Sequence, residues 1–384
     1  MTNRIILNGT SYFGRESRNS IVKELKQRNF KKAFLVTDEQ LMLAGVTKLI
    51  TNILNEEGFD YDLYCKIKPN PTVENVQEGL SECRKSSADV IIAVGGGSVI
   101  DTAKAISIIM TNREHEDVVS LDGVVETKNP GLPIIALPTT AGTAAEVTIN
   151  YVITDPVAGK KMVCVDPHDI PIIAIIDPEL MEKMPKTLAA ATGMDALTHA
   201  MEGYTTKAAW LMTDMFHLNA MALIYKNLDK AVLEKDKDAI DNVGYGQYIA
   251  GMGFSNVGLG IVHSMAHALG AMYDTPHGLA NALILPHVLR FNGKICPELF
   301  RNMGRAIGLD MSNLNDEEAV NKVAYAVQRL AIKLGIPQKL NEIGIKEEDL
   351  PALSRLALND VCTAGNPRKV TEKDILSLFQ EMYS

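Results

Sequence analysis

The chain has 384 residues, of which 46% are hydrophobic and 22% charged, and its formal net charge at pH 7 is −9. This length exceeds the size at which a single hydrophobic core usually stops growing, so two domains are expected, and the balanced composition argues against a disordered or fibrous protein. Lys and Arg are scattered among a larger number of Asp and Glu, which argues against nucleic acid or an anionic membrane as the partner. A small molecule is therefore the expected ligand.

The first residues, MTNRIILNGTSYFGRES, are polar within a few positions and contain no secretory signal pattern. No run reaches the roughly 18 uninterrupted apolar residues that a membrane helix needs. The five cysteines are widely spaced without a CxxC pair, as is typical of free thiols in a reducing compartment. We therefore expect a cytoplasmic protein without a membrane partner.

The first half of the chain alternates short β-branched apolar runs with helical stretches of about a dozen residues. The runs are continuous rather than alternating, as strands buried on both faces of a parallel sheet require. They lie at residues 31–38, 61–68, 88–98, 132–140 and 170–180. We also expect an edge strand or hairpin arm at residues 4–9 and a hairpin formed by 150–155 and 160–166. The prediction for residues 1–184 is an α/β domain with a mostly parallel, Rossmann-like sheet.

The composition and the residue pattern of the sequence change after the segment MPKTLAAATG. Ala, Leu, Met, Glu and Lys dominate from there on, with apolar positions at helical spacing and no convincing strand. We therefore predict an all-helical domain over residues 185–384. The expected helices cover residues 187–206, 210–233, 236–252, 258–271, 278–292, 296–307, 316–334, 348–358 and 371–382.

A glycine-rich turn, Gly95, Gly96, Gly97 and Ser98, follows one of the predicted strands and opens a helix. Backbone N–H groups exposed at a helix N-terminus suit a pyrophosphate. However, Ile100 stands where the dinucleotide fingerprint has a third glycine, and the Gly-Lys-Ser/Thr of a P-loop is absent. Taken alone, the turn fits phosphate binding and a merely structural connection about equally well.

Two other loops at strand ends favour a nucleotide. Asp38 closes a strand, where a carboxylate commonly binds the adenosine ribose hydroxyls and would repel a 2′-phosphate, which favours NAD over NADP. A simple helix N-cap or turn residue is an alternative of comparable weight. The segment from Pro138 to Thr143 leaves another strand and offers hydroxyls and free amides. Polar loops at the carboxyl ends of parallel strands mark the crevice in which open α/β sheets bind ligands.

Histidines at helical spacing in the second half indicate a metal site. Asp195 and His199 are four residues apart, which places their side chains on one helix face, about 5–6 Å apart at Cβ. His263 and His267 repeat this spacing, and His277 follows. A carboxylate with imidazoles suits Zn²⁺ or Fe²⁺ better than Mg²⁺ or Ca²⁺. Spacing alone does not choose among His263, His267 and His277.

For any one of these histidines, a hydrogen-bonded core position is the more frequent explanation. Two pairs at i, i+4 spacing in one apolar domain shift the balance toward a metal. His217 and His287 have no partner at ligand spacing and are expected to be structural.

Several long motifs resemble those of the iron-dependent (group III) alcohol dehydrogenases. They occur in the family's order between residues 38 and 370 and include GGGSVIDTAK, PTTAGTAAEVTINYVIT, VDPHDIP, ATGMDALTHAMEGY, GMGFSNVGLGIVHSMAHALGAMYDTPHGLANALILPHV and DVCTAGNPR. The resemblance implies a dinucleotide-binding domain and a helical metal-binding domain, with the metal and the cofactor in the cleft between them. It also implies NAD, a divalent metal and a homodimer; Fe²⁺ is the expected metal, with Zn²⁺ or Ni²⁺ as alternatives.

Carried over motif by motif, the resemblance assigns the metal ligands to Asp195, His199, His263 and His277. It gives His267 a catalytic role as a proton relay near the substrate. The residues expected to bind NAD are Asp38, Asn70, Gly95, Gly96, Gly97, Ser98, Thr139, Thr140, Thr143 and Lys161. Those expected near the nicotinamide and the substrate are Asn150, Phe254 and Cys362, the last as a thiol that is not a nucleophile.

The implied activity is reversible hydride transfer between NAD(H) and a short-chain alcohol or aldehyde, with the metal acting as a Lewis acid. The motifs are most similar to those of family members that interconvert lactaldehyde and 1,2-propanediol. Alternatives are a glycerol or other short-chain alcohol dehydrogenase and a cyclase similar to dehydroquinate synthase. A cyclase needs Arg and Lys beside the metal for its phosphorylated substrate, whereas residues 250–290 contain only Arg290. A non-catalytic nucleotide-binding protein would lack one of the four ligands, and all four are present.

Overall fold

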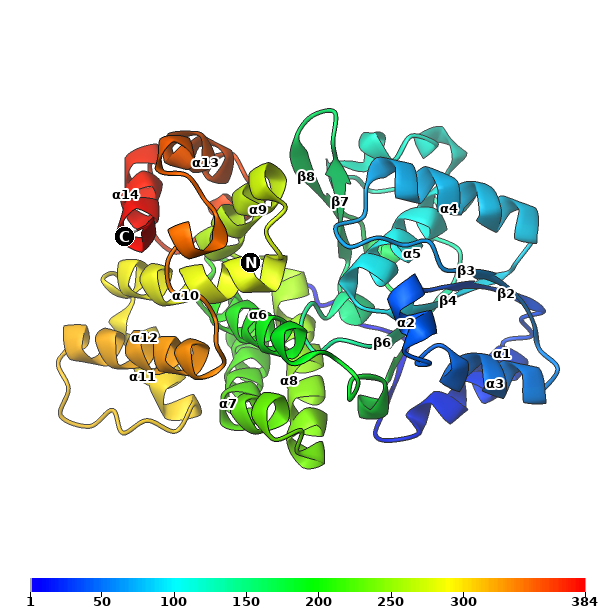
Figure 1. Ribbon diagram of the computed structural model, residues 1–384, viewed down its shortest axis with the longest axis horizontal. Coiled ribbons are helices and arrows are strands. Elements are labelled where there is room, and N and C mark those ends of the chain that lie inside the picture. Colours follow the sequence, from blue (N-terminus) through cyan, green and yellow to red (C-terminus); the bar gives the residue numbers. More distant parts are fainter. Residues whose placement is uncertain (1, 384) are drawn as a thin grey trace. The chain divides into compact units, whose positions relative to one another are not determined.

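The computed structural model describes residues 2–383, and the chain divides between Met184 and Pro185 into two compact units. The N-terminal unit combines a parallel sheet with helices, and the C-terminal unit is built from helices (Figure 1). Among residues 2–383, no helix has both the length and the apolar character needed to cross a bilayer.

The N-terminal unit is organised around a six-stranded sheet in the order β1-β9-β6-β4-β2-β3. All of its neighbouring strands run parallel, which confirms the predicted Rossmann-like sheet. The strands are β1 (Thr10–Phe13), β2 (Lys32–Val36), β3 (Asp60–Tyr64), β4 (Val90–Gly95), β6 (Ile134–Pro138) and β9 (Ile173–Ile176). The helices around the sheet are α1 (Ser20–Gln27), α2 (Glu39–Leu43), α3 (Lys48–Glu56), α4 (Val73–Ser86) and α5 (Gly97–Thr111).

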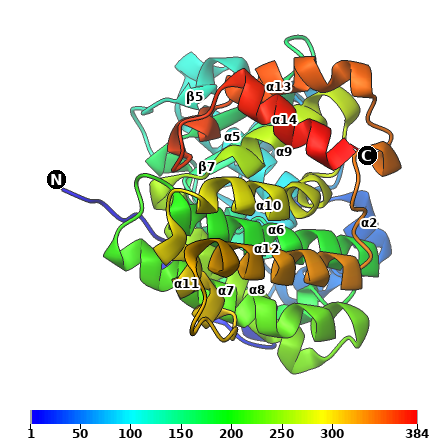
Figure 2. The same cartoon turned by 90° about the vertical axis from the view of Figure 1, so that its left-hand side faces the viewer.

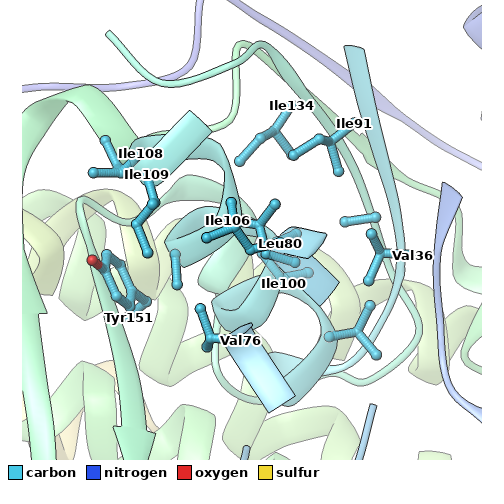
Figure 3. Close-up of a cluster of buried hydrophobic side chains, with 14 of the residues drawn as sticks. Val36, Val76, Leu80, Ile91, Ile100, Ile106, Ile108, Ile109, Ile134 and Tyr151 are labelled. Atoms are coloured by element: carbon cyan, nitrogen blue, oxygen red, sulfur yellow. The ribbon is translucent and has the colours of Figure 1, made fainter. Parts of the chain in front are cut away.

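The central strands are apolar at every position because both faces of the sheet are covered. Along β4, Ile91 and Ala93 belong to one hydrophobic cluster with α4 and α5, whereas Ile92 and Val94 belong to another with α1 and α3. Figure 3 shows part of the first cluster, in which Ile91 lies near Ile134 of the neighbouring strand. Each fully buried aliphatic side chain contributes about 1.5–3 kcal/mol, so the two clusters hold the sheet between its helical layers.

The strand order reverses between β2 and β4, because β3 lies on one side of β2 and β4 on the other. The helices that follow these two strands lie on opposite faces of the sheet: Ile50 of α3 belongs to one cluster and Ile100 of α5 to the other. The carboxyl ends of β2 and β4 therefore flank a topological switch point, where open α/β sheets bind ligands.

The predicted hairpin is present as β7 (Asn150–Asp155) and β8 (Lys160–Val165). The short strand β5 (Gly123–Val124) pairs with β8, and the three strands form a second sheet. Helix α5 fixes its position. Asp101 Oδ2 accepts a hydrogen bond from the Val152 N–H at 3.1 Å, and the buried Lys104 Nζ donates to the carbonyls of Thr148 and Asn150 at 2.6 and 2.9 Å. The helix that the glycine turn opens thus also positions this hairpin.

The strand predicted at residues 4–9 is wrong. The edge strand β1 begins only at Thr10, which pairs with Ile173 of β9. Continued backward, this register would bring residues 4–9 alongside residues 167–172, which include Pro171, and proline has no N–H to extend a ladder. The segment is held instead by Asn8, whose Nδ2 donates to the carbonyls of Glu146 and Pro171.

The C-terminal unit contains helices at every position predicted from the spacing of apolar residues, with ends that differ by a few residues. They are α6 (Lys186–Thr205), α7 (Leu211–Leu233), α8 (Lys237–Val257), α9 (Ile261–Tyr273), α10 (His277–Gly293), α11 (Pro297–Ala306), α12 (Asp316–Lys333), α13 (Leu350–Leu358) and α14 (Glu372–Tyr383). Helix α10 packs against both α6 and α12 (Figure 2). The candidate metal-binding side chains come from α6, α9 and α10.

Candidate metal centre and nucleotide-binding loops

Four polar side chains converge in the helical unit. Asp195 and His199 come from α6, His263 from α9 and His277 from the first position of α10, and one possible ligand atom of each lies within 4.8 Å of all the others. Asp195 Oδ1 is 3.9 Å from His263 Nε2 and 3.7 Å from His277 Nε2, and Asp195 Oδ2 is 4.0 Å from His199 Nδ1. The structure thus brings together the four residues that the motifs assign to the metal.

The local sequence explains how α10 comes so close to α6. A Cβ atom at Gly278 would lie 2.6 Å from the Ala191 carbonyl oxygen and 3.3 Å from Asp195 Cβ. Any larger residue would therefore push the start of α10 away from the α6 backbone. Glycine at this position lets His277, its neighbour in the chain, reach Asp195.

Asn281, one helical turn after His277, lies among the four side chains and was not predicted. Its Nδ2 donates to Asp195 Oδ1 at 2.6 Å and lies 3.2 and 3.1 Å from the Nε2 atoms of His263 and His277. The residue is fully buried, and its Oδ1 has no hydrogen-bond partner among the described residues. Its i, i+4 spacing from His277 was the available signal in the sequence.

Burial shifts the pKa values of Asp195 and His263 toward the neutral forms of both side chains. It raises the pKa of Asp195, although His199 and the hydrogen bond from Asn281 oppose the rise, and it holds the pKa of His263 well below its usual value. A cation would favour both the ionised carboxylate and the neutral imidazole. One carboxylate, three imidazoles and an orphaned amide oxygen form a donor set that fits a divalent transition metal.

Phe254, expected near the substrate, packs directly on one of these four residues. Its ring stacks on that of His199, with centroids 4.2 Å apart and an angle of 12° between the planes. Phe254 lies near the end of α8 and is buried. It therefore packs against one face of the His199 imidazole and restricts the orientation of this ring.

His267 belongs to a separate group with Asp360 and Cys362, and Asp360 was not predicted. The His267 Nδ1 lies 2.8 Å from Asp360 Oδ2. Burial would raise the pKa of Asp360, but the charge of His267 and hydrogen bonds from His267, Cys362 and Ser264 outweigh it and lower this pKa to about 2. Burial raises the pKa of Cys362 well above its usual value, so this side chain is a thiol.

The two histidines expected to be structural have other surroundings. His217 is fully buried on α7, where Cβ atoms at Gly203 and Gly253 would each lie 2.3 Å from its Nε2. Neither ring nitrogen has a hydrogen-bond partner among the described residues. The Nδ1 of His287 lies 2.8 Å from Glu381 Oε1. Neither residue belongs to the group of four.

The glycine turn lies at the carboxyl end of β4 and packs against the loop that follows β6. A Cβ atom would lie 3.0 Å from Thr140 Cγ2 at Gly96 and 2.8 Å from Thr143 Cγ2 at Gly97. Gly96 is the N-cap of α5, and its carbonyl accepts from the N–H groups of Val99 and Ile100 at 3.1 and 3.2 Å. It has no side chain to cap the N–H groups of Gly97 and Ser98, which come before them in the helix. Ser98 follows in the first turn, and the Thr139 N–H donates to the Gly95 carbonyl at 3.0 Å.

Other residues expected at the nucleotide lie around neighbouring strand ends. Asp38 Oδ1 accepts from the Leu41 N–H at 2.8 Å and thereby caps α2, as the alternative explanation proposed. Lys161 of β8 donates to Asn70 Oδ1 at 2.7 Å, so these two expected residues contact each other. Asn150 begins β7 in the same unit, whereas Phe254 and Cys362 belong to the helical unit.

Two family models match the chain. "Iron-containing alcohol dehydrogenase" covers residues 8–178, and "Fe-containing alcohol dehydrogenase family, C-terminal" covers residues 189–383. The lactaldehyde reductase of Escherichia coli (strain K12) is 51% identical over 379 residues, 99% of each chain. The NAD-dependent methanol dehydrogenase of Bacillus methanolicus is 39% identical over 371 residues, 96% of this chain and 97% of its own. A crystal structure of 1,3-propanediol oxidoreductase superposes with a TM-score of 0.96 at 39% identity and covers all of both chains.

Proposed function

Because the chain belongs to the family of iron-containing alcohol dehydrogenases, we propose that it interconverts lactaldehyde and 1,2-propanediol by reversible hydride transfer with NAD(H). The family models confirm the membership that the motifs predicted. The similarity to a lactaldehyde reductase over nearly the whole chain supports the substrate. The observation that carries the proposal is the convergence of Asp195, His199, His263 and His277 within 4.8 Å in a buried part of the helical unit.

These four residues would hold a divalent metal, for which Fe²⁺ is the expected ion and Zn²⁺ or Ni²⁺ the alternatives. When bound there, the metal supplies a Lewis acid that polarises the carbonyl group of the aldehyde. Asp195 contributes the negative charge of the site, and the buried imidazole of His263 is kept neutral by its low pKa. Phe254 excludes water from one side of His199 through ring stacking.

The N-terminal unit would bind NAD(H), which supplies or accepts the hydride. The glycine turn and Ser98 offer N–H groups at the N-terminus of α5 for the pyrophosphate, beside hydroxyls of Thr140 and Thr143. Asp38 uses Oδ1 to cap α2, and we assign its other oxygen to a ribose hydroxyl. The contact between Lys161 and Asn70 orders the loop after β3, and Thr139 completes the set expected at the cofactor. Asn150 is expected near the nicotinamide and the substrate.

His267 would deliver the proton that converts the reduced oxygen into an alcohol. With Nδ1 bound to Asp360, the Nε2 of His267 is the atom that can exchange a proton with substrate or water. Cys362 contributes an undissociated thiol to the substrate pocket rather than a nucleophile. We also expect a homodimer, as the motif resemblance implies, and light scattering of the purified protein measures it.

The test is NADH oxidation by lactaldehyde, using protein purified without oxygen and reconstituted with Fe²⁺, Zn²⁺ or Ni²⁺. We expect turnover with at least one metal, and loss of both metal and turnover in His263→Ala. His287→Ala, which changes a histidine outside the group of four, is the matched control and should retain the metal. No turnover after full metal loading, or unchanged turnover in His263→Ala, would overturn the proposal.

The alternative cyclase has less support. Its phosphorylated substrate needs basic side chains beside the metal, but Arg290 donates to Gln328 Oε1 and to the Pro286 carbonyl. Glycerol and other short alcohols remain direct competitors of 1,2-propanediol. Including them in the same assay decides the substrate by the ratio of kcat/KM values.

A further inference from the structure

Glu202 is a buried carboxylate that the mechanism above does not use. It lies on α6, three residues after His199 and seven after Asp195, and therefore on the same face of the helix. Its carboxylate reaches the start of α9. Oε1 accepts from the Val262 N–H at 2.8 Å, and Oε2 accepts from the His263 N–H at 3.2 Å and lies 2.7 Å from His263 Nδ1.

We propose that Glu202 is a positioning residue of the metal centre, which holds the imidazole of His263 in the tautomer whose Nε2 faces the other ligands. This inference rests on the proposed role of His263 as a metal ligand. Glu202 itself is not a ligand in this proposal, because its carboxylate is occupied on the other side of the His263 ring.

The contacts on both sides of the His263 ring select the same tautomer. Glu202 receives backbone N–H groups, so its oxygens act as acceptors and Nδ1 must carry the hydrogen that is donated to them. On the opposite side, Nε2 lies 3.2 Å from Asn281 Nδ2, which is itself a donor. A neutral ring that donates from Nδ1 has its lone pair at Nε2, and this atom is 3.9 Å from Asp195 Oδ1.

The N-terminus of α9 offers backbone N–H groups to the Glu202 carboxylate and leaves space for it at Gly260. Gly260, the N-cap residue, has no side chain that could cap the helix, and a Cβ atom there would lie 2.8 Å from Glu202 Oε1. Glu202 therefore takes the place of a cap from a different helix, and the dipole of α9 favours its negative charge. Burial raises the pKa of Glu202 to about 7, against the opposing effect of the N–H groups of Val262, His263 and Gly260.

Carboxylates that bind the second nitrogen of a metal-bound histidine fix the ring orientation and increase its basicity. The chain offers a matched comparison, because His267 lies on α9 as His263 does. Asp360 makes the same kind of contact to Nδ1 of His267, at 2.8 Å, but His267 is outside the group of four. Of these two carboxylates, Glu202 should therefore affect how tightly a metal binds, because Asp360 contacts no member of the group of four.

The experiment measures Zn²⁺ affinity by competition with a chromophoric chelator, in the wild type, Glu202→Gln and Asp360→Asn. Glutamine keeps the length of the side chain but replaces one acceptor oxygen with a donor, which opposes donation from Nδ1. We expect the Kd for Zn²⁺ to rise about 10–100-fold in Glu202→Gln. The Asp360→Asn protein should bind Zn²⁺ with the affinity of the wild type.

A second variant separates orientation from loss of charge. Gly260→Ala keeps the charge of Glu202 but places a Cβ atom 2.8 Å from its Oε1 and 3.0 Å from Asn366 Oδ1, so the carboxylate must shift. We expect weaker Zn²⁺ binding with a fold that circular dichroism shows to be intact. The Co²⁺-loaded proteins should also differ in their visible absorption, because the orientation of one ligand has changed.

Wild-type affinity in Glu202→Gln, or an equal loss in Glu202→Gln and Asp360→Asn, would overturn the role of Glu202. If Glu202→Gln does not fold, wild-type affinity in Gly260→Ala would overturn it. Failure of the proposed function is distinguishable, because in that case His263→Ala itself would bind Zn²⁺ as tightly as the wild type.

Discussion

Asp360 and His267 are 93 residues apart in the chain, yet their Oδ2 and Nδ1 atoms form a 2.8 Å hydrogen bond. The other oxygen, Oδ1, accepts from Ser264 Oγ at 3.1 Å and from the Cys362 N–H at 2.9 Å, so both carboxylate oxygens are engaged. The imidazole of His267 also stacks on that of His277, with centroids 5.3 Å apart. The proposed proton carrier is thereby fixed next to a proposed metal ligand without belonging to the group of four.

Asp360→Asn should lower kcat by about 10–100-fold, because asparagine can hold His267 in the wrong tautomer. The KM for lactaldehyde and the metal content should stay near their wild-type values, since Asp360 does not contact the four ligand atoms. Steady-state kinetics together with metal analysis measure both quantities. An unchanged kcat would show that the orientation of His267 does not limit the reaction.

Asp38→Asn should weaken the preference for NADH over NADPH. Asparagine retains the side-chain oxygen that caps α2 through the Leu41 N–H, so the fold should be preserved. It removes the negative charge expected to repel a 2′-phosphate, and a repulsion of about 1.4 kcal/mol corresponds to a tenfold change in preference. The ratio of kcat/KM for the two cofactors provides the measurement, and a ratio equal to that of the wild type contradicts the placement of the ribose at Asp38.

Gly278→Ala should destabilise the helical unit and weaken metal binding. The new Cβ would lie 2.6 Å from the backbone oxygen of Ala191, where no flexible side chain can yield. Overpacking of this kind costs about 1–3 kcal/mol. Gly9→Ala is a suitable control, because its nearest neighbour would be at an ordinary contact distance of 3.5 Å. Urea unfolding and Zn²⁺ titration of both variants test this, and identical behaviour would argue against a close approach of α10 and α6.

His217→Leu should make the protein less sensitive to acid. Burial lowers the pKa of His217 to about 3, whereas in the unfolded chain it titrates near 6.5. The unfolded state therefore binds more protons between these values, so the contribution of His217 to stability is complete above pH 6.5 and is lost as the pH falls toward 3. Leucine cannot take up a proton, and at pH 4 the variant should retain about 3 kcal/mol that the wild type loses.

The measurement for this variant is the free energy of unfolding at pH 7 and pH 4 by urea denaturation. At pH 7 the substitution should be tolerated, since the two nitrogens of His217 have no hydrogen-bond partner among residues 2–383. Parallel loss of stability in both proteins on acidification would show that His217 does not titrate on unfolding.

The sequence predicted those features that depend on local patterns. Continuous apolar runs identified the parallel strands, because both faces of the sheet are buried, and helical spacing identified the helices of the C-terminal unit. The pairing of Asp195 with His199 followed from spacing on α6. The choice of His263 and His277 over His267 came from the motifs, because spacing carries no information about the distance between separate helices.

Features that depend on distant partners could not be predicted in this way. The start of β1 is set by the register with β9 and by Pro171, more than 150 residues away. Glu202 and Asp360 meet histidines that are 61 and 93 residues distant. The spacing of Glu202 places it on the same face of α6 as Asp195 and His199, but this spacing does not indicate that its partner is His263. Asn281 differs, because its spacing from His277 was visible in the sequence.

Helix α6 carries Asp195, His199 and Glu202 within two turns, so the spacing along this one segment sets both the proposed metal site and the contact of Glu202 with His263. Deleting a single residue between Asp195 and Glu202 would turn one relative to the other by about 100° around the helix axis. The two carboxylates would then face different neighbours, and no side-chain adjustment could restore both. Length in this segment is therefore constrained more tightly than the identity of its apolar residues, and Leu197 or Met201 should tolerate exchange for side chains of similar volume.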